Sequence, residues 1–299
     1  MLNSSYLGET LALITAVSWA LAVIFYRLAG QHLTPIAYTL FKSLITILLL
    51  LLTLVFLDQS IDFSAWTPVE FLLIAASGIL GVTLGDVLYV ASVNRIGAGM
   101  TSIIDCLYTP LMVFFAATVF SESLSGPEIF GGCLVLGSVL MIGIMRDSHP
   151  DFSNPEFKKG IFLGVVAQLC MVLAIVTIKN LLNESSLLPI MTLRYIIGTA
   201  PLLLFLSKKQ HREDFKTAFR FNRVATWSIA GTLLGSYIST LAWFGGFQYE
   251  AAGRIAILHQ SSTAFLILFA TLLLKEKITL LRFAAISLAL SGALIVVLS

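Results

Sequence analysis

The sequence feature that most constrains the fold is a pair of apolar helices that occurs twice in the chain. Residues 81–122 align with residues 235–276 without a gap, so that Gly81 matches Gly235. Each copy contains an apolar segment, a tight turn rich in glycine and alanine, and a second apolar segment. A repeated pair of apolar helices predicts an all-α protein that is built from a duplicated unit.

The apolar content places this duplicated unit in a membrane. Hydrophobic residues make up 58% of the 299 residues and charged residues only 11%, whereas a soluble domain carries about 25% charged residues. A spanning helix needs about 20 apolar residues. Ten segments meet this requirement, at 7–29, 33–57, 68–93, 98–120, 126–146, 157–180, 187–207, 223–248, 251–273 and 279–298. We therefore predict an all-α polytopic membrane protein with ten transmembrane helices.

The chain divides into two halves at its most polar central stretch. This stretch runs from Arg146 to Phe157 and contains prolines and charges. It predicts two domains, residues 1–148 and residues 149–299, with five helices each. Because five is an odd number, the second half enters the membrane from the opposite side. Inverted repeats around a central cavity are typical of secondary transporters, which bind their substrate near the middle of the membrane.

The basic residues predict the orientation of the chain. They gather in loops on one side of the predicted bundle, which the positive-inside rule makes the cytoplasmic side. The largest group lies between the seventh and eighth helices, at Lys208, Lys209, Arg212, Lys216, Arg220 and Arg223. An even number of helices then places both termini outside the cell.

Four features in their order along the chain carry a family resemblance. They are the run ALITAVSWALA at Ala12–Ala22, Pro110 after a polar stretch, the glutamates Glu122 and Glu276 that close two helices, and the last helix FAAISLALSGALIVVL. With the duplication, they make the chain resemble the EamA-type branch of the drug/metabolite transporter superfamily. The resemblance covers nearly the whole chain.

The resemblance implies a secondary carrier of the bacterial inner membrane that exports amino acids, metabolites or toxic compounds. In this family the fourth and ninth helices line a central cavity, together with the first, third, sixth and eighth. The family often has proline at the position of Ala264. Its absence here predicts that the two halves are kinked unequally.

Five titratable residues lie deep inside apolar segments: Lys42, Asp86, Asp105, Arg194 and His259. Charged groups at this depth cost at least about 2.5–3.5 kcal/mol and mark functional positions by default. Each lies about eight to ten residues from a helix end, which is roughly 14 Å at about 1.5 Å per residue. We therefore expect all five around one central cavity.

We expect different roles for these groups. Lys42 and Asp86 form an ion pair that holds helices together, or they take part in gating or proton coupling. Asp105 and His259 occupy equivalent positions of the two halves. A carboxylate at Asp105 suits a substrate ammonium, Arg194 suits an anionic group, and His259 titrates near neutral pH and suits proton coupling.

Neutral side chains complete the predicted substrate site. Gln260 follows His259 and opens a polar run in the ninth helix, which favours a wet cavity over simple contacts between helices. Aromatic residues in the expected cavity helices suit a cationic or amino-acid substrate, although each could instead pack against neighbours or lie at the bilayer interface. They are Trp19, Tyr89, Tyr108 and Trp243.

The favoured function is therefore secondary export of a small polar or zwitterionic, amino-acid-like metabolite, coupled to protons. One alternative is a multidrug exporter for aromatic or cationic compounds. The other is an intramembrane enzyme that uses Asp86 and Asp105 as a carboxylate pair, and we favour transport over catalysis. A single deep histidine speaks against a metal site, and we expect no cofactor. The expected partners are the small-molecule substrate, the lipid bilayer and protons, with no nucleic acid, in a monomer or homodimer.

Overall fold

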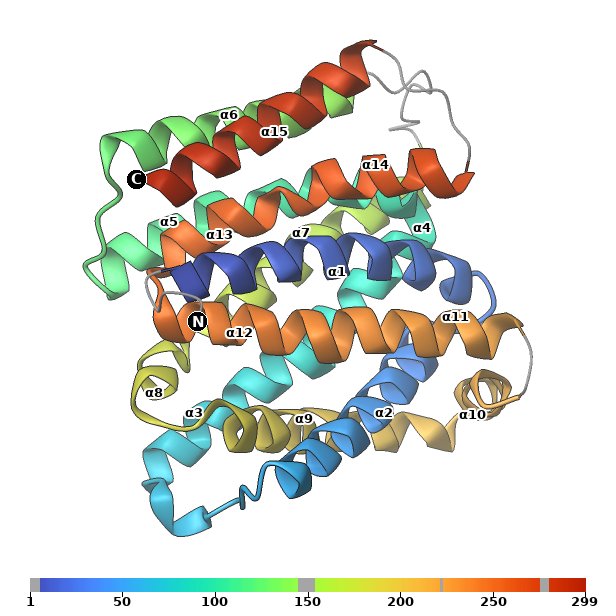
Figure 1. The fold of residues 1–299 in the computed structure, drawn as a ribbon. Coiled ribbons are helices and arrows are strands. Elements are labelled where there is room, and N and C mark those ends of the chain that lie inside the picture. The colour runs from blue at the N-terminus through green and yellow to red at the C-terminus, as the bar shows by residue number, and fades with distance from the viewer. Residues whose placement is uncertain (1–5, 145–153, 221–222, 275–279) are drawn as a thin grey trace.

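The computed structural model of the chain describes residues 6–144, 154–220, 223–274 and 280–299, and these residues form a bundle of helices (Figure 1). The first half contains α1 (Leu7–Gly30), α2 (Pro35–Phe56), η2 (Phe63–Ala65), α3 (Pro68–Gly78), η3 (Ile79–Gly85), α4 (Asp86–Ile104), η4 (Asp105–Leu107), α5 (Tyr108–Val119) and α6 (Gly126–Ile144). The second half contains α7 (Pro155–Val176), α8 (Lys179–Glu184), α9 (Leu187–Leu204), η5 (Phe205–Ser207), α10 (Lys209–Ala218), α11 (Arg223–Gly231), η6 (Thr232–Ser239), α12 (Thr240–Tyr249), α13 (Ala252–Gln260), α14 (Ser262–Leu274) and α15 (Leu280–Leu298).

These helices occupy all ten of the apolar segments, so the predicted fold class is confirmed. Within the described residues, five helical runs are long and apolar enough to cross a membrane: Leu7–Gly30, Pro35–Phe56, Pro68–Gly97, Pro155–Val176 and Leu187–Ser207. The remaining segments are shorter or are interrupted in the middle. The chain is an all-α polytopic membrane protein.

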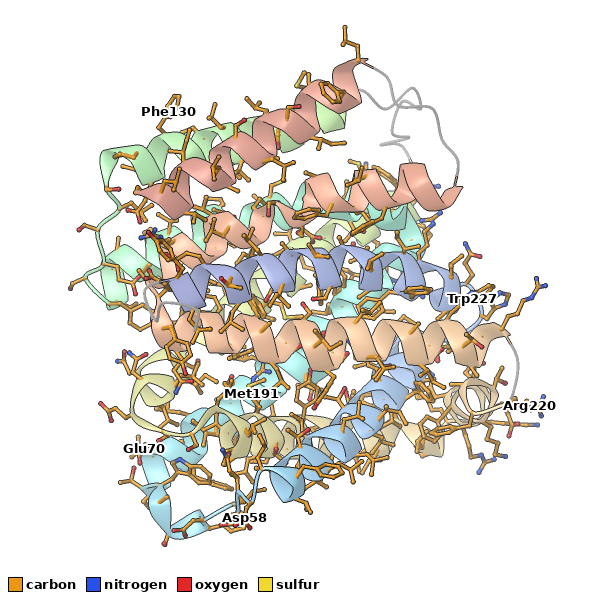
Figure 2. The ribbon with its side chains drawn as sticks, in the orientation of Figure 1. Asp58, Glu70, Phe130, Met191, Arg220 and Trp227 are labelled. Carbon is orange, nitrogen blue, oxygen red and sulfur yellow. The ribbon has the colours of Figure 1, made fainter. Side chains whose placement is uncertain are left out.

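Side chains at the surface of the bundle agree with this environment. Figure 2 shows Phe130 projecting away from α6, on the flank of the bundle, where 58% of its surface is exposed. The acidic Glu70 and the basic Arg220 lie at opposite ends of the bundle. Apolar flanks with polar ends are what a helical bundle needs to cross a bilayer.

The two halves pack into each other, because the first helix of each half lies against helices of the other half. Helix α1 packs against α11, η6, α12, α13 and α14, and α7 packs against η3, α4 and α5. Helices α6 and α15, the last of each half, pair along one edge of the bundle (Figure 1). The centre of the bundle is therefore built from both halves.

Helices α6 and α15 meet through two glycines. An added Cβ at Gly292 would lie 2.6 Å from the Gly131 carbonyl oxygen, and one at Gly131 would lie 2.7 Å from the Gly292 carbonyl oxygen. Small residues let helix backbones approach this closely in a membrane, where dispersion contacts between helices replace the hydrophobic effect.

The central helices are interrupted at positions that match between the halves. The third and eighth segments each contain a π-helical turn, at Ile79–Gly85 and Thr232–Ser239, which coincide under the repeat alignment. The fourth segment narrows to a 3₁₀ turn at Asp105–Leu107, and the ninth breaks at the equivalent place, at Ser261 between α13 and α14. Interruptions of this kind inside helices are frequent at functional sites.

Both segments are interrupted, and the ninth is interrupted at Ser261 without a proline, while the predicted inequality of the two kinks stays a prediction. In the fourth segment Pro110 has no N–H to donate to the carbonyl four residues earlier. In the ninth, the Ser261 N–H and hydroxyl both donate to the Leu258 carbonyl oxygen, at 3.2 and 2.7 Å. The Ala264 N–H donates to the Ser261 carbonyl oxygen at 3.0 Å. The Ser261 hydroxyl therefore accompanies a break in the ninth segment at the place where the fourth segment is broken near Pro110.

The glycine contact generates a stability prediction. We expect Gly292→Ala to lower the free energy of unfolding by about 1–3 kcal/mol, because its Cβ would push α15 away from α6. Thermal unfolding of the purified protein in detergent measures this. Gly137→Ala on α6 is the matched control, since the nearest atom to its Cβ would lie 4.0 Å away. Equal stability of both variants would contradict the proposed backbone contact.

Candidate functional site

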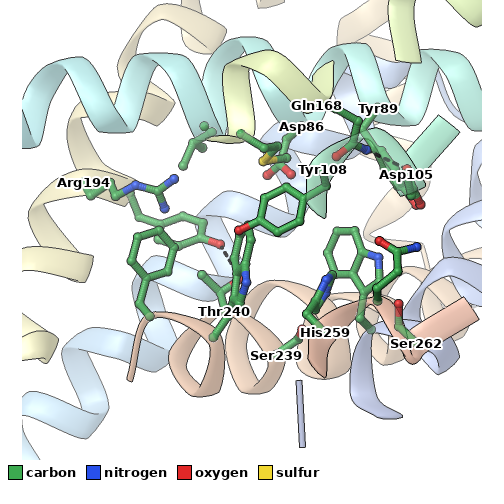
Figure 3. A pocket seen from close by; sticks show the side chains of 18 residues that line it. Asp86, Tyr89, Asp105, Tyr108, Gln168, Arg194, Ser239, Thr240, His259 and Ser262 are labelled. Atoms are coloured by element: carbon green, nitrogen blue, oxygen red, sulfur yellow. Dashed lines mark hydrogen bonds between the residues drawn. The ribbon is translucent and has the colours of Figure 1, made fainter. Parts of the chain in front are cut away.

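A cavity lies in the centre of the bundle, where the helices are interrupted (Figure 3). The free space between its lining side chains, open solvent included, is about 720 Å³. Its lining comes from α1, η3, α4, η4, α5 and α7, and from α9, η6, α12, α13 and α14. Nine of the ten predicted site residues line it: Trp19, Asp86, Tyr89, Asp105, Tyr108, Arg194, Trp243, His259 and Gln260.

The tenth predicted residue, Lys42, is buried behind the cavity wall and pairs with Asp86. The Lys42 Nζ lies 2.8 Å from the Asp86 Oδ2 and 4.9 Å from the centre of the Tyr26 ring. Lys42 is 1% exposed and Asp86 is 7% exposed. The pair therefore neutralises both charges inside the bundle and joins α2 to the start of α4.

Asp105 has neutral hydrogen-bond donors in place of a cation. The Tyr89 hydroxyl donates to Asp105 Oδ2 at 3.0 Å, and the Gln168 Nε2 donates to Oδ1 at 2.6 Å. Among the described side chains, none of the lysines, arginines or histidines lies within 4.0 Å of this carboxylate. Asp105 is thus oriented by hydrogen bonds, while its charge is left without a counterion.

Gln168 was missed by the sequence analysis. It lies on α7, in the second half of the chain, and is 6% exposed. A single glutamine in an apolar helix has no spacing that links it to an aspartate sixty-three residues away. Only its amide, which needs hydrogen bonds when buried, marked it as unusual.

Arg194 is the opposite case, a buried cation without a carboxylate. It is 3% exposed, its Nε donates to the Ser77 Oγ at 2.9 Å, and its guanidinium lies 4.5 Å from the centre of the Phe244 ring. The Ser77 hydroxyl donates in turn to the Ala174 carbonyl oxygen at 2.5 Å. No ion pair joins Arg194 to an acidic side chain in the parts of the chain that the structure describes.

The guanidinium reaches the cavity over a glycine. A Cβ at Gly81 would collide with the Nη2 of Arg194, so the glycine at this position makes room for the cation. Figure 3 shows the guanidinium of Arg194 at one end of the cavity and Asp105 at the other. The two groups that lack a counterion therefore face each other along its length.

Aromatic rings line the cavity between these two ends. The His259 ring stacks on Trp243, with centroids 5.5 Å apart, and the Tyr108 ring lies 5.8 Å from His259 and 5.4 Å from Trp243. Trp19 lies between His259 and Tyr89, at 6.4 and 5.4 Å. Among the described residues, the Tyr108 hydroxyl, the Trp243 Nε1 and the His259 Nδ1 are buried without a hydrogen-bond partner.

The polar run after His259 serves both the cavity and the packing of helices. Gln260 and Ser262 line the cavity. The Thr109 hydroxyl donates to the Gln260 Oε1 at 3.1 Å and lies 3.2 Å from the Ala256 carbonyl oxygen, which joins α5 to α13. The Gln260 Nε2 donates to the Thr263 Oγ1 at 3.3 Å. Gln260 therefore connects the two interrupted helices as well as facing the cavity.

A cluster of acidic residues around Arg254 closes one end of the bundle. Arg254 lies 3.1 Å from Glu9 and 3.7 Å from Glu128, and it donates to the Val297 carbonyl oxygen at 3.1 Å. These contacts connect α1, α6, α13 and α15. Among the described residues, no group of three His, Cys, Asp or Glu side chains is arranged to hold a metal ion.

Comparisons with known proteins point in one direction. A profile described as the EamA-like transporter family matches residues 6–144 and again residues 158–298. An uncharacterized transporter of the cyanobacterium Synechocystis is 28% identical over 165 residues, which are 50% of this chain and 47% of that protein. That match thus spans about half the length of the relative. A protein of known crystal structure shares the fold, with a TM-score of 0.75 and 14% identity over 96% of this chain and 95% of its own.

The buried ion pair of Lys42 with Asp86 can be tested by substitution. We expect Lys42→Met to lower the free energy of unfolding by about 3–5 kcal/mol, because it leaves Asp86 buried and unpaired. The double variant with Asp86→Asn should recover most of that loss. Thermal unfolding in detergent measures both.

Arg95→Met is the control for this experiment, since its ion pair with Glu156 at 3.1 Å is partly exposed and contributes no more than about 1 kcal/mol. A double variant that folds well yet transports nothing would show that the pair has a role in coupling or gating. A double variant as unstable as the single one would contradict the pairing.

Proposed function

The chain belongs to the EamA-like transporter family, and we propose that it is a secondary active carrier for a small polar or zwitterionic, amino-acid-like metabolite. Membership of this family indicates a membrane transporter that acts on a small molecule and is in contact with lipid. The single observation that supports this substrate class is a cavity lined by Asp105 and Arg194, neither of which forms an ion pair among the described residues. A zwitterion would neutralise both.

In this proposal each charged end of the cavity binds one group of the substrate. Asp105 accepts hydrogen bonds from the substrate ammonium, and Arg194 donates to its carboxylate. Charge-assisted bonds of this kind are roughly twice as strong as neutral ones. Tyr89 and Gln168 hold the Asp105 carboxylate in place through 3.0 and 2.6 Å bonds, so it is oriented before the substrate arrives.

Proton coupling would come from the same carboxylate. A carboxylate without a counterion inside a membrane is costly as an anion, so Asp105 binds either a proton or a substrate ammonium. Exchange of the two would couple inward movement of a proton to outward movement of the substrate. His259 would relay the proton between Asp105 and the cavity, and the Lys42–Asp86 pair would stabilise the bundle or gate it.

The remaining parts of the proposal concern the whole protein. We propose that residues 1–148 and 149–299 are the two inverted repeats, and that alternating access arises from their relative movement. The protein would lie in the inner membrane of a bacterium, as a monomer or homodimer. The side of the membrane on which helix α10 lies would be cytoplasmic.

A second candidate function rests on the aromatic lining. Trp19, Tyr89, Tyr108 and Trp243 line the same cavity as the Asp105 carboxylate, and such rings suit flat organic cations. A multidrug exporter would use this lining together with Asp105 and would have no need of Arg194. Arg194 separates the two functions, because its cation repels a cationic drug and attracts a zwitterion.

A transport assay tests the proposal. In proteoliposomes we expect uptake of labelled amino acids to rise when a pH gradient is imposed, and Asp105→Asn to lower kcat/KM by at least about 30-fold, or roughly 2 kcal/mol. Asp214→Asn is the matched control, since Asp214 accepts a hydrogen bond from the Thr34 N–H at 3.0 Å, outside the cavity. Full activity of Asp105→Asn and His259→Ala would reject the site.

The same vesicles decide between the two functions. We expect Arg194→Gln to abolish the transport of amino acids, because their carboxylate loses its cation. Transport of tetraphenylphosphonium that survives Arg194→Gln but is lost in Trp243→Ala would favour the multidrug exporter. A chemically altered product in place of a relocated solute would favour an enzyme.

A further inference from the structure

The two ends of the cavity can be placed along one helical wall. The guanidinium of Arg194 lies directly over Gly81, at the π-helical turn. The Asp105 carboxylate accepts its hydrogen bond from Tyr89, eight residues further along the same continuous run of helix, Pro68–Gly97. Gly81 and Tyr89 both line the cavity and therefore share its face.

Helical geometry converts this spacing into a distance. Eight residues at about 1.5 Å per residue separate Gly81 and Tyr89 by roughly 12 Å, and slightly less where the turn is π-helical. The turn at Gly97, which has a φ of 79°, lies eight residues from both Tyr89 and Asp105. Asp105 is therefore at the depth of Tyr89. With the guanidinium placed at Gly81 and the carboxylate at the depth of Tyr89, helix rise gives an estimate of about 10–12 Å between the two charged groups.

This distance sets the separation of charges in a substrate that touches both ends. Each of the two charge-assisted hydrogen bonds takes up about 2.8 Å, which leaves roughly 4–6 Å between the substrate nitrogen and a carboxylate oxygen. The ammonium and carboxylate of an α-amino acid share one carbon and lie too close together. With bonds of about 1.5 Å, two to four methylene groups in an extended chain span the gap.

We infer that the transported zwitterion carries its amine and its carboxylate at the two ends of a chain of two to four methylene groups, bound between Asp105 and Arg194. This inference rests on the proposed function of the cavity. Between the ends, the methylene chain lies against the rings of Tyr108, Trp243 and His259, which are packed 5.4 to 5.8 Å apart. Apolar ring faces suit methylene groups.

The ion pair of Lys42 with Asp86 disfavours a shorter substrate that would bind between Asp86 and Arg194. Asp86 lies between Gly81 and Tyr89 on the same wall and could hold an amine closer to Arg194. Its Oδ2 is already 2.8 Å from the Lys42 Nζ, so its charge is neutralised by the protein. An α-amino acid bound at Asp86 would have to compete with Lys42, whereas a longer zwitterion meets no such competitor at Asp105.

A series of ω-amino acids tests the inference. Labelled glycine, β-alanine and their homologues with three, four, five and seven methylenes are offered to proteoliposomes at the same pH gradient. We expect the highest kcat/KM within the range of two to four methylenes, and values at least about tenfold lower for glycine and for the longest homologue. A maximum at glycine, a maximum at five or more methylenes, or a flat series would overturn the inference.

Lengthening the protein side chain should shift this optimum. Asp105→Glu adds one methylene to the carboxylate, and we expect the preferred substrate to become shorter by about one methylene. Asp62→Glu makes the same change in an exposed loop, where the carboxylate accepts a hydrogen bond from Ser64 at 2.9 Å, and should leave the series unchanged. An unshifted optimum in Asp105→Glu would reject Asp105 as the anchor for the amine.

The series separates failure of the inference from failure of the proposed function. If common α-amino acids are transported better than every longer homologue, the carrier function stands and the assignment of the two ends is wrong. If an organic cation is transported and neither α-amino acids nor their longer homologues are, both the inference and the proposed function are wrong.

Discussion

In the interior of this bundle, backbone N–H and C=O groups need partners within the protein, because a bilayer offers no water to replace them. The four interruptions of the central helices obey this constraint in different ways. Proline at position 110 removes a donor, while the Ser261 hydroxyl supplies an extra bond to the Leu258 carbonyl oxygen at 2.7 Å. Each interruption contributes to the cavity lining: Gly81, Asp105, Ser239 and, beside the break at Ser261, Ser262.

The same constraint sorts the buried charges into two classes. Lys42 and Asp86 neutralise each other at 2.8 Å, and this pair behaves as part of the framework. Asp105 and Arg194 are held by neutral groups, Tyr89, Gln168 and Ser77. Such partners fix a side chain in place without neutralising it, which is the property that a binding site for a charged solute requires.

Much of this arrangement was predictable from sequence, because depth in a membrane can be counted from helix ends. The duplication and the apolar segments predicted the fold, and the counting placed Asp86, Asp105 and Arg194 around one cavity, which all three line. The pairing of Lys42 with Asp86 followed as one of two options. Contacts between helices that are remote in sequence could not be counted in this way, and Gln168, Ser77 and Tyr26 were therefore missed.

The interruptions themselves were only partly predictable. Pro110 predicts a break in the fourth segment, whereas the equivalent break at Ser261 in the ninth depends on how the serine hydroxyl is oriented. The π-helical turns at Ile79–Gly85 and Thr232–Ser239 cannot be recognised in a run of apolar residues. The extra residue in each turn rotates the residues that follow it to another face, but it does not change which of them are apolar. The roles of the site residues remain proposals that the transport experiments address.

The bond from Gln168 to Asp105 has a mechanical consequence. Asp105 belongs to the first half of the chain and Gln168 to the second, so their 2.6 Å bond fastens one repeat to the other. An arriving ammonium competes with the Gln168 amide for the same oxygen atoms. If the proposed substrate displaced the Gln168 amide from Asp105, its binding would remove one hydrogen bond between the two repeats and so ease their relative movement.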